Sequence, residues 1–214
     1  MDKKYWNTYY QQHGKDKGIS KCSSFAQFCL DNFFIEKNYN IVELGSGNGR
    51  DAIFLAHYKH NVIAIDQSIA AIDIEKLSLD LEVAQYLHPK ALDFVQEDYI
   101  QYEKIDVFYS RFTIHSITEE DELSLLPKVY NTLNSGGLFC VEVRTTKDPL
   151  YGVGKACGKN TFITDGHKRR FIDSREFRER VSVLGFKELH FIEEDNLSIY
   201  KDDNPVLMRI ILEK

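Results

Sequence analysis

Three glycines at alternating positions give this sequence its clearest chemical signal. Gly45, Gly47 and Gly49 follow directly on an apolar run at 41–44 that is rich in β-branched residues, and a helical apolar pattern begins at Ala52. Glycine lets the backbone approach a ligand closely, and a helix N-terminus directs unpaired N–H groups toward it. The pattern predicts a nucleotide-binding turn between a buried strand and a helix.

Two acidic residues flank this turn and narrow the choice of ligand. Asp66 ends the next apolar run, 62–65, where a carboxylate can accept hydrogen bonds from both ribose hydroxyls. Glu43 stands two residues before the first glycine, a poor neighbour for a pyrophosphate but a good one for an ammonium or a sulfonium. The dinucleotide fingerprint Gly-x-Gly-x-x-Gly also needs a glycine where this chain has Arg50. These features favour a cationic nucleoside ligand.

Residues 42–49, Val-Glu-Leu-Gly-Ser-Gly-Asn-Gly, resemble the first motif of the class I S-adenosylmethionine (SAM) dependent methyltransferases. The resemblance covers roughly residues 23–214. It implies SAM as methyl donor and S-adenosylhomocysteine as product. It also implies a single Rossmann-like α/β domain, whose seven-stranded, mostly parallel sheet has the order 3-2-1-4-5-7-6, strand 7 antiparallel and helices on both faces. The cofactor ligands that follow from it are Trp6, Tyr10, Glu43, Gly45, Ser46, Gly47, Asn48, Gly49, Asp66, Gln67, Ser68, Asp98, Tyr99 and Ser110.

Hydrophobic periodicity and capping residues supply the elements that such a fold needs. Thr118 with Asp121, and Asp173 with Glu176, predict two helix starts. Strands are expected at 41–44, 62–65, 91–95, 105–112, 138–143, 187–192 and 206–212, and helices at 23–34, from 52, 68–84, 118–133 and 173–184.

Residues 1–22 are expected to form an N-terminal lid helix. Trp6 and Tyr10 are four residues apart, as on one face of a helix. They resemble the Trp-x-x-x-Tyr pattern of an initial helix that folds over the cofactor in many small-molecule methyltransferases. The alternative is a helix that only covers the edge of the core.

Further cofactor contacts are inferred from the loops after the second and third strands. Gln67 and Ser68 lie where adenosine contacts often arise in this family. Asp98, beside Tyr99, resembles the acidic residue that binds the adenine amino group. A solvated acidic turn is the alternative for Asp98.

The acceptor is expected at the carboxyl end of the fourth strand, because ligands of such sheets bind there. This places Ser110, Arg111, Phe112 and His115 beside the SAM methyl group. His115 and His167 are the candidate catalytic bases, since histidine titrates near neutral pH. The alternatives are a packing role for His115 and an exposed loop position for His167.

Residues 144–173 form a long polar stretch with little periodicity, which we interpret as a loop that makes an acceptor-binding insert. A flexible basic surface loop is the alternative. Arginine binds carboxylate and phosphate in bidentate fashion, so convergent arginines predict a small, polar, anionic acceptor. O-methylation of a sugar, sugar acid, phosphorylated metabolite or glycan end is expected. The candidate acceptor ligands are Arg111, Arg144, Tyr151, Arg169 and Arg170.

Composition limits the other function classes. The net charge of -6 and pI of about 5.7 argue against duplex nucleic acid as the main partner. The sequence has no apolar run near 18 residues, no signal-peptide pattern and no metal-ligand spacing, so we expect no membrane span, no metal and a cytoplasmic location. Four scattered cysteines suit reduced thiols.

Two other functions stay open. One is a nicotinamide-dependent oxidoreductase or epimerase, which the glycine spacing and the lack of a helical Tyr-x-x-x-Lys pair disfavour. The other is a non-catalytic SAM-binding module, which needs no acceptor site.

Overall fold

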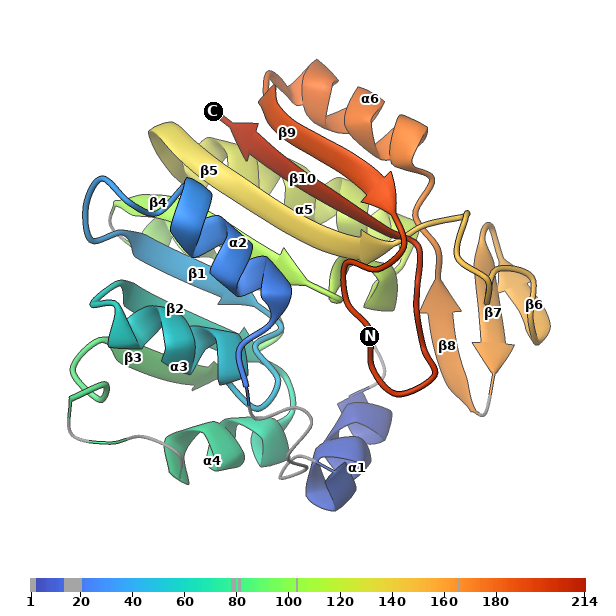
Figure 1. Ribbon diagram of the computed structural model, residues 1–214, viewed down its shortest axis with the longest axis horizontal. Coiled ribbons are helices and arrows are strands. Elements are labelled where there is room, and N and C mark those ends of the chain that lie inside the picture. The colour runs from blue at the N-terminus through green and yellow to red at the C-terminus, as the bar shows by residue number, and fades with distance from the viewer. Residues whose placement is uncertain (1–2, 14–20, 78–79, 81, 103, 165) are drawn as a thin grey trace. The chain divides into compact units, whose positions relative to one another are not determined.

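The computed structural model of the chain describes residues 3–13, 21–77, 80, 82–102, 104–164 and 166–214. The backbone forms two compact units, Asp2–Tyr109 and Ser110–Lys214. We call them the N-terminal and the C-terminal unit and describe each by itself (Figure 1).

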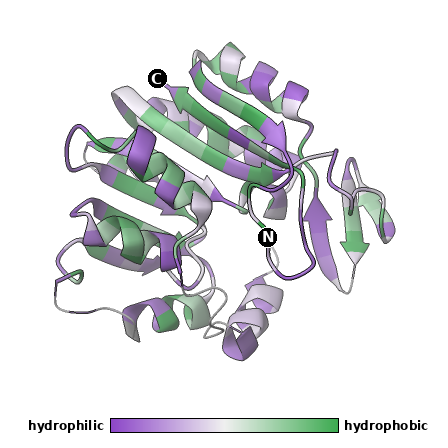
Figure 2. Ribbon diagram, in the orientation of Figure 1, coloured by the Kyte–Doolittle hydropathy of each residue, from purple (hydrophilic) through white to green (hydrophobic). Residues whose placement is uncertain are grey.

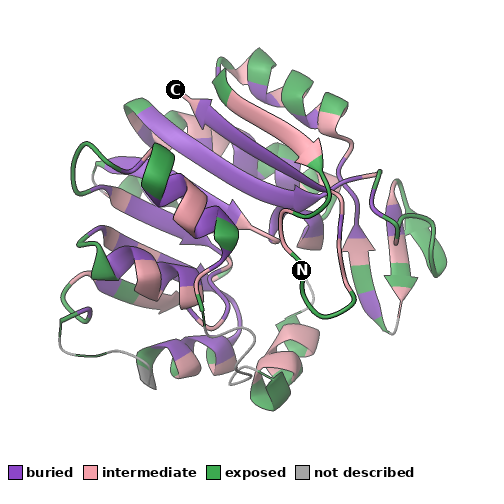
Figure 3. Ribbon diagram, viewed as in Figure 1, coloured by how far each residue is buried: buried purple, intermediate pink, exposed green. Residues whose placement is uncertain are grey.

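The N-terminal unit alternates helices with parallel strands. In β1, β2 and β4 apolar side chains follow one another without a polar face, as in a parallel sheet covered on both sides (Figure 3). Ile41 of β1 pairs with Val62 of β2 and with Val107 of β4, and Val62 pairs with Leu87 of β3. The elements are α1 (Lys3–His13), α2 (Ser24–Asn32), β1 (Asn40–Leu44), α3 (Arg50–His57), β2 (Asn61–Asp66), α4 (Ile69–Leu77), β3 (Leu87–Ala91), the 3-10 turn η2 (Tyr99–Gln101) and β4 (Ile105–Arg111).

Two predicted boundaries in this unit are wrong. The third strand is Leu87–Ala91, not 91–95, because the backbone turns away after Ala91 and the Asp93 side chain accepts a hydrogen bond from the Val95 N–H (2.9 Å). Pro89 is tolerated because β3 is an edge strand. Helix α4 ends at Leu77 rather than at 84, and Asp80 caps a separate turn. Leu81, which belonged to the predicted helix, lies outside the described residues.

The C-terminal unit is built on antiparallel pairs. β10 lies between β5 and β9, and its Ile210 pairs with Val141 and with Phe191 (Figure 1). Hydrophobic residues dominate β10 and the second half of β5 (Figure 2). The elements are the 3-10 turn η3 (Ile114–Ser116), α5 (Glu119–Thr132), β5 (Leu133–Arg144), β6 (Lys155–Gly158), β7 (Thr161–Thr164), β8 (His167–Arg170), α6 (Ser174–Leu184), β9 (Lys187–Glu194) and β10 (Leu207–Glu213).

Both predicted helix starts in this unit are present. Thr118 and Asp121 form a complete capping box at α5. The Asp173 side chain caps α6 and Gly185 ends this helix with a φ of 105°. Glu176 binds Lys159 and Arg180, and the structure shows a simple N-cap at α6.

The seven strands of the main sheet have the order β3-β2-β1-β4-β5-β10-β9. Counted along the chain within this sheet, the order is 3-2-1-4-5-7-6, and the strand that comes last in the chain is antiparallel to both neighbours. The predicted fold class is confirmed.

The prediction that residues 144–173 are an irregular loop is wrong. They contain a three-stranded antiparallel sheet, β6-β7-β8. The rings of Tyr151, Phe162 and Phe171 pack on one another, with centroids 5.3 to 6.1 Å apart. A bridge between Thr145 and Ile172 joins the two ends of the insert. The strands are only four residues long, so periodicity could not reveal them.

No helix within the described ranges is long and apolar enough to cross a membrane.

Candidate functional site

The glycine turn between β1 and α3 uses backbone conformations that favour glycine. Gly45, Gly47 and Gly49 have φ values of 74°, 60° and 78°. The N–H groups of Gly45 and Ser46 both donate to the Ile65 carbonyl, at 2.7 and 3.0 Å. The turn is therefore fixed to the end of β2.

Side chains approach the turn so closely that two of its glycines have no room for a Cβ atom. A Cβ on Gly47 would lie 2.2 Å from the Tyr10 hydroxyl oxygen, and one on Gly49 would lie 2.5 Å from the Glu75 carboxyl carbon. Burial, and next the Asp66 carboxylate, raise the pKa of the Tyr10 hydroxyl. The predicted lid tyrosine therefore lies on the turn as a neutral phenol.

Asp66 connects the turn to the start of α4. One carboxylate oxygen accepts from the Gly47 N–H (3.0 Å) and the other from the Ser68 N–H (2.7 Å). Burial raises the pKa of Asp66, and these two hydrogen bonds oppose the rise. Each oxygen has a further lone pair, so the carboxylate keeps acceptor capacity for a ligand hydroxyl.

Glu75 is a site residue that the sequence analysis missed. Its side chain is fully buried, and Oε2 accepts from the Ser46 hydroxyl at 3.3 Å. Among the described residues, Oε1 has no hydrogen-bond partner. Burial, the largest effect, raises the pKa of Glu75 to about 8. The available signal was its position three residues after Ile72, on the apolar face of α4.

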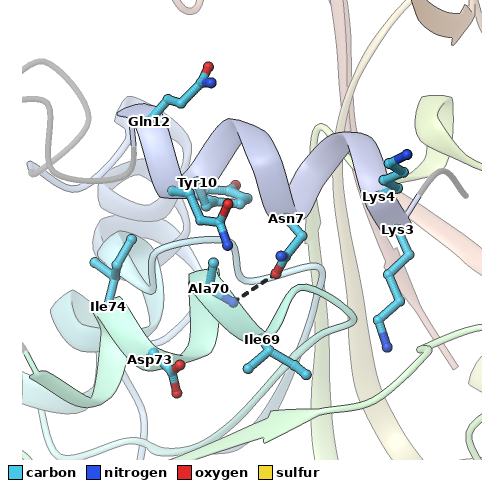
Figure 4. A pocket seen from close by; sticks show the side chains of 10 residues that line it. Lys3, Lys4, Asn7, Tyr10, Gln12, Ile69, Ala70, Asp73 and Ile74 are labelled. Atoms are coloured by element: carbon cyan, nitrogen blue, oxygen red, sulfur yellow. Dashed lines mark hydrogen bonds between the residues drawn. The ribbon is translucent and has the colours of Figure 1, made fainter.

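Helix α1 lies against α4 within the N-terminal unit (Figure 4). The Asn7 side-chain oxygen accepts from the Ala70 N–H at 3.1 Å and from the Ser68 hydroxyl at 3.3 Å. The Trp6 ring lies tilted beside that of Tyr10, with ring centroids 6.1 Å apart. Between the two helices lies a pocket of about 820 Å³, lined by Lys3, Lys4, Asn7, Tyr10, Gln11, Gln12, Ile69, Ala70, Asp73 and Ile74.

Three other predicted cofactor residues of this unit have two kinds of surroundings. Gln67 is buried beside Asp66, and its amide nitrogen has no hydrogen-bond partner among the described residues. Asp98, in contrast, is exposed and caps η2 through the Ile100 N–H (3.1 Å). Tyr99 is a core residue whose hydroxyl donates to the Phe94 carbonyl. Asp98 and Tyr99 thus have structural roles here, and their cofactor roles stay predictions.

In the C-terminal unit, three of the five predicted acceptor ligands, Arg144, Arg169 and Arg170, lie around His115 together with His167. His115 lies on η3, is 5% exposed, and its ring centroid is 5.6 Å from that of Phe112. Burial lowers the pKa of His115 well below its usual value, and the charges of Arg169, Arg144, His167 and Arg170 lower it further. The structure brings these predicted residues together in one basic cluster, His115, Arg144, His167, Arg169 and Arg170.

Two arginines of the basic cluster are bound by the protein itself. Arg144 donates to Asp148 at 2.9 Å and to Asp203. Arg170 donates from Nε to the Ile117 carbonyl at 3.1 Å and from Nη2 to the Ile114 carbonyl at 3.2 Å. Its Nη2 also donates to Glu122. Their guanidinium groups therefore stabilise the backbone around the cluster.

At the end of β4 the Arg111 side chain contacts β5 and the loop between β9 and β10. Arg111 donates to Glu142 (2.8 Å) and to the Ser198 hydroxyl (2.8 Å). Glu142 is fully buried and also accepts from Arg209 at 2.6 Å. Ser110 is buried and bonded to the Thr113 hydroxyl. Neither Glu142 nor Arg209 was predicted, because charges inside apolar runs give no spacing pattern.

Phe112, at the same end of β4, has a strained backbone conformation. It is not a glycine, yet its φ is 58°, a conformation that costs a bulky residue about 1–3 kcal/mol. Its N–H donates to the Glu142 carbonyl at 2.9 Å, and its ring lies 4.2 Å from the Arg111 guanidinium.

Tyr151, unlike the residues around His115, packs in the β6-β7-β8 insert, where its hydroxyl donates to Asn160. Tyr151 stays a predicted acceptor ligand only.

The sheet order, the glycine turn after β1 and the acid at the end of β2 together define the class I methyltransferase fold. The family model "Methyltransferase domain" matches residues 41–137. Residues 41–137 are thus similar to a methyltransferase domain, and the resemblance seen in residues 42–49 is confirmed.

Individual proteins are similar to the chain in sequence or in fold. Carboxy-S-adenosyl-L-methionine synthase of Vibrio campbellii (strain ATCC BAA-1116) is 31% identical over 112 residues, which are 50% of this chain and 44% of that protein. The chain thus aligns with less than half of that relative's length. Burkholderia thailandensis 1,6-didemethyltoxoflavin-N1-methyltransferase, crystallised with S-adenosylhomocysteine, has a TM-score of 0.75 at 13% identity over 99% of this chain and 86% of that one. The CcbJ methyltransferase from Streptomyces caelestis has a TM-score of 0.73 at 13% identity over 98% and 97%.

Proposed function

We propose that this protein transfers a methyl group from SAM to a small, polar, anionic acceptor. The observation that carries the cofactor half is the glycine turn, where Gly47 and Gly49 leave no room for side chains and Asp66 is fixed by two backbone N–H groups. Such a turn suits a ligand that lies close to the backbone and presents ribose hydroxyls to a carboxylate. The turn lies within residues 41–137, which the family model matches, and it is the feature that the motif at 42–49 predicts.

The residues present fit SAM in charge as well as in shape. Glu43 and Asp66 are buried acidic groups at or beside the turn, and they suit a ligand that carries an ammonium and a sulfonium. Tyr10 and α1 would cover that ligand as a lid, with Asn7 holding the helix to α4. When bound, SAM supplies an activated methyl group, so the protein's task is to orient the reactants and exclude water.

The acceptor half of the proposal rests on the basic cluster. Four cationic or ionisable side chains act on the neutral His115, and this field favours an anion. Arg169 is half-buried and His115 lies at the centre, so these two are the proposed direct contacts. Arg144 and Arg170 support them. A sugar acid, a phosphorylated metabolite or an anionic glycan end suits such a site, in the cytoplasm as the sequence predicts.

Mass spectrometry can test this function on the whole chain. The protein is incubated with SAM and with matched pairs of acceptors, for example a sugar acid and its neutral sugar. Release of S-adenosylhomocysteine together with a methylated anionic product is the expected result. Methylation of the neutral partner at the same rate would contradict the proposed anionic acceptor.

A second candidate function follows from the similarity to carboxy-S-adenosyl-L-methionine synthase. The product in that name is SAM with an added carboxyl group, so SAM itself would be the acceptor. The basic cluster could hold an anionic carboxyl donor equally well. With an anionic carboxyl donor added, the same experiment separates the two functions, because carboxylated SAM would then form in place of S-adenosylhomocysteine.

A further inference from the structure

The two ring nitrogens of His115 have different surroundings. Nδ1 accepts a hydrogen bond from the Arg144 backbone N–H, at 3.5 Å. A neutral imidazole that accepts at Nδ1 carries its proton on Nε2. We propose, resting on the function proposed above, that His115 binds a carboxylate of the acceptor through its Nε2–H and is not the base of the reaction.

The turn that carries His115 is fixed from outside. Arg170 donates to the carbonyls of Ile114 and Ile117, which flank the histidine, at 3.2 and 3.1 Å. Glu122 binds Arg170 and is itself bound by Arg180 at 2.7 Å. A three-residue 3-10 turn has few hydrogen bonds of its own, so this support fixes the direction of the ring. Arg170 is a positioning residue.

The groups that face His115 come from two strands and from the end of β4. Arg144 belongs to β5, while His167, Arg169 and Arg170 belong to β8. The Phe112 ring covers another side. Burial and these positive charges oppose a proton on Nδ1, so the ring stays a neutral donor in a field that attracts anions.

This arrangement defines the class of nucleophile. A carboxylate can accept the Nε2–H bond with one oxygen and attack with the other. A lone pair of the attacking oxygen forms the new O–C bond, the S–C bond breaks, and its electron pair stays on sulfur. No proton has to be removed, so the step needs no base. The products are a methyl ester and S-adenosylhomocysteine.

The tautomer can be tested without any acceptor. The chain is labelled with ¹⁵N-histidine, and long-range ¹H–¹⁵N spectra of wild type and His115→Gln identify the His115 signals. The expected result is a neutral ring with its proton on Nε2 at pH 7, unchanged at pH 6. An Nδ1–H tautomer or a charged imidazolium at pH 7 would overturn the proposal.

Carboxylate binding is tested with sodium acetate as the probe, against sodium chloride at equal ionic strength. Acetate should shift the His115 Nε2–H signal. Its affinity should fall about tenfold in His115→Phe and clearly less in His115→Gln, whose amide keeps an N–H donor. The exposed His57→Gln is the matched control and should bind acetate as wild type does. No shift with acetate, or equal affinity in His115→Phe, would overturn the carboxylate site.

The failure of this inference and of the proposed function are distinguishable. SAM that does not bind by calorimetry, with an intact acetate response at His115, rejects the methyltransferase function alone. SAM that binds normally, with His115 in the wrong tautomer, rejects only the role of His115.

Discussion

The Tyr10 hydroxyl lies so close to Gly47 that a Cβ atom on this glycine would be 2.2 Å from the phenolic oxygen. A residue of the first helix thus contacts the turn that the whole sequence pattern centres on. Asn7, on the same helix, accepts from the Ala70 N–H at the start of α4 (Figure 4). The lid expected from Trp6 and Tyr10 therefore has two points of attachment.

We expect Gly47→Ala to displace Tyr10 from the turn. The φ of 60° alone costs an alanine about 1–2 kcal/mol of unfolding free energy, and the added methyl group also pushes the phenol away. Amide exchange in α1 should accelerate. The matched control is Gly136→Ala, since Gly136 has a φ of 73° but open space around it. An α1 exchange rate that stays the same in Gly47→Ala as in Gly136→Ala would refute the contact.

Asn7→Ala should loosen α1 from α4 because two hydrogen bonds to Asn7 are lost. We expect the SAM affinity to fall about three- to tenfold, as measured by calorimetry. Thr8→Ala, an exposed position on the same helix, is the control and should bind SAM normally. Faster exchange of the Ala70 amide with an unchanged SAM affinity would mean that α1 is not a lid.

The pH dependence of stability should reveal Glu75. Its pKa is raised from 4.5 to about 8, so the folded state holds a proton that the unfolded state releases. The stability it contributes is present below pH 4.5 and is lost as the pH rises toward 8. Glu75→Gln, which stays neutral, should therefore be more stable than wild type at pH 8.5, by roughly a few kcal/mol, and the difference should shrink toward pH 5.

Denaturant unfolding at the two pH values measures this effect. Glu82→Gln, a substitution at an exposed position of the same unit, is the matched control. An equal gain for Glu75→Gln at pH 5 and pH 8.5 would show that Glu75 is ionised throughout.

Arg170→Lys tests the support of η3. Lysine keeps the charge but cannot bind Glu122 and the carbonyls of Ile114 and Ile117 at once. We expect a loss of about 1–3 kcal/mol in unfolding free energy and a changed His115 environment in ¹⁵N spectra. Arg175→Lys, at an exposed position, should change neither. Wild-type stability in Arg170→Lys would show that η3 does not depend on Arg170 for its conformation.

The first two strands could be predicted from the sequence because they are largely apolar runs, one followed by Gly45 and the other ended by Asp66. The turn at Gly47 and its partner strand were found for that reason. The insert was missed because its strands of four residues are too short to show a period. Pro89 and the short turn at Asp93 hid the true third strand.

The sequence predicted which residues belong to the candidate site better than it predicted the contacts that they make. The sequence grouped Arg144 and Arg170 as acceptor ligands, and the structure places both in the cluster. Their ion pairs with Asp148 and Glu122 join residues that spacing alone does not link to a ligand site. Glu75 was missed because a buried carboxyl on a helix is indistinguishable in sequence from an exposed one.

The most direct test of the central claim is isothermal titration calorimetry of the whole chain with SAM, S-adenosylhomocysteine and NADH. Wild type should bind the first two and not NADH. Asp66→Ala should lose binding, and Asp31→Ala, an exposed control on α2, should keep it, with folding of each variant checked by thermal unfolding. Binding of NADH instead of SAM, or full SAM affinity in a folded Asp66→Ala, would contradict the account.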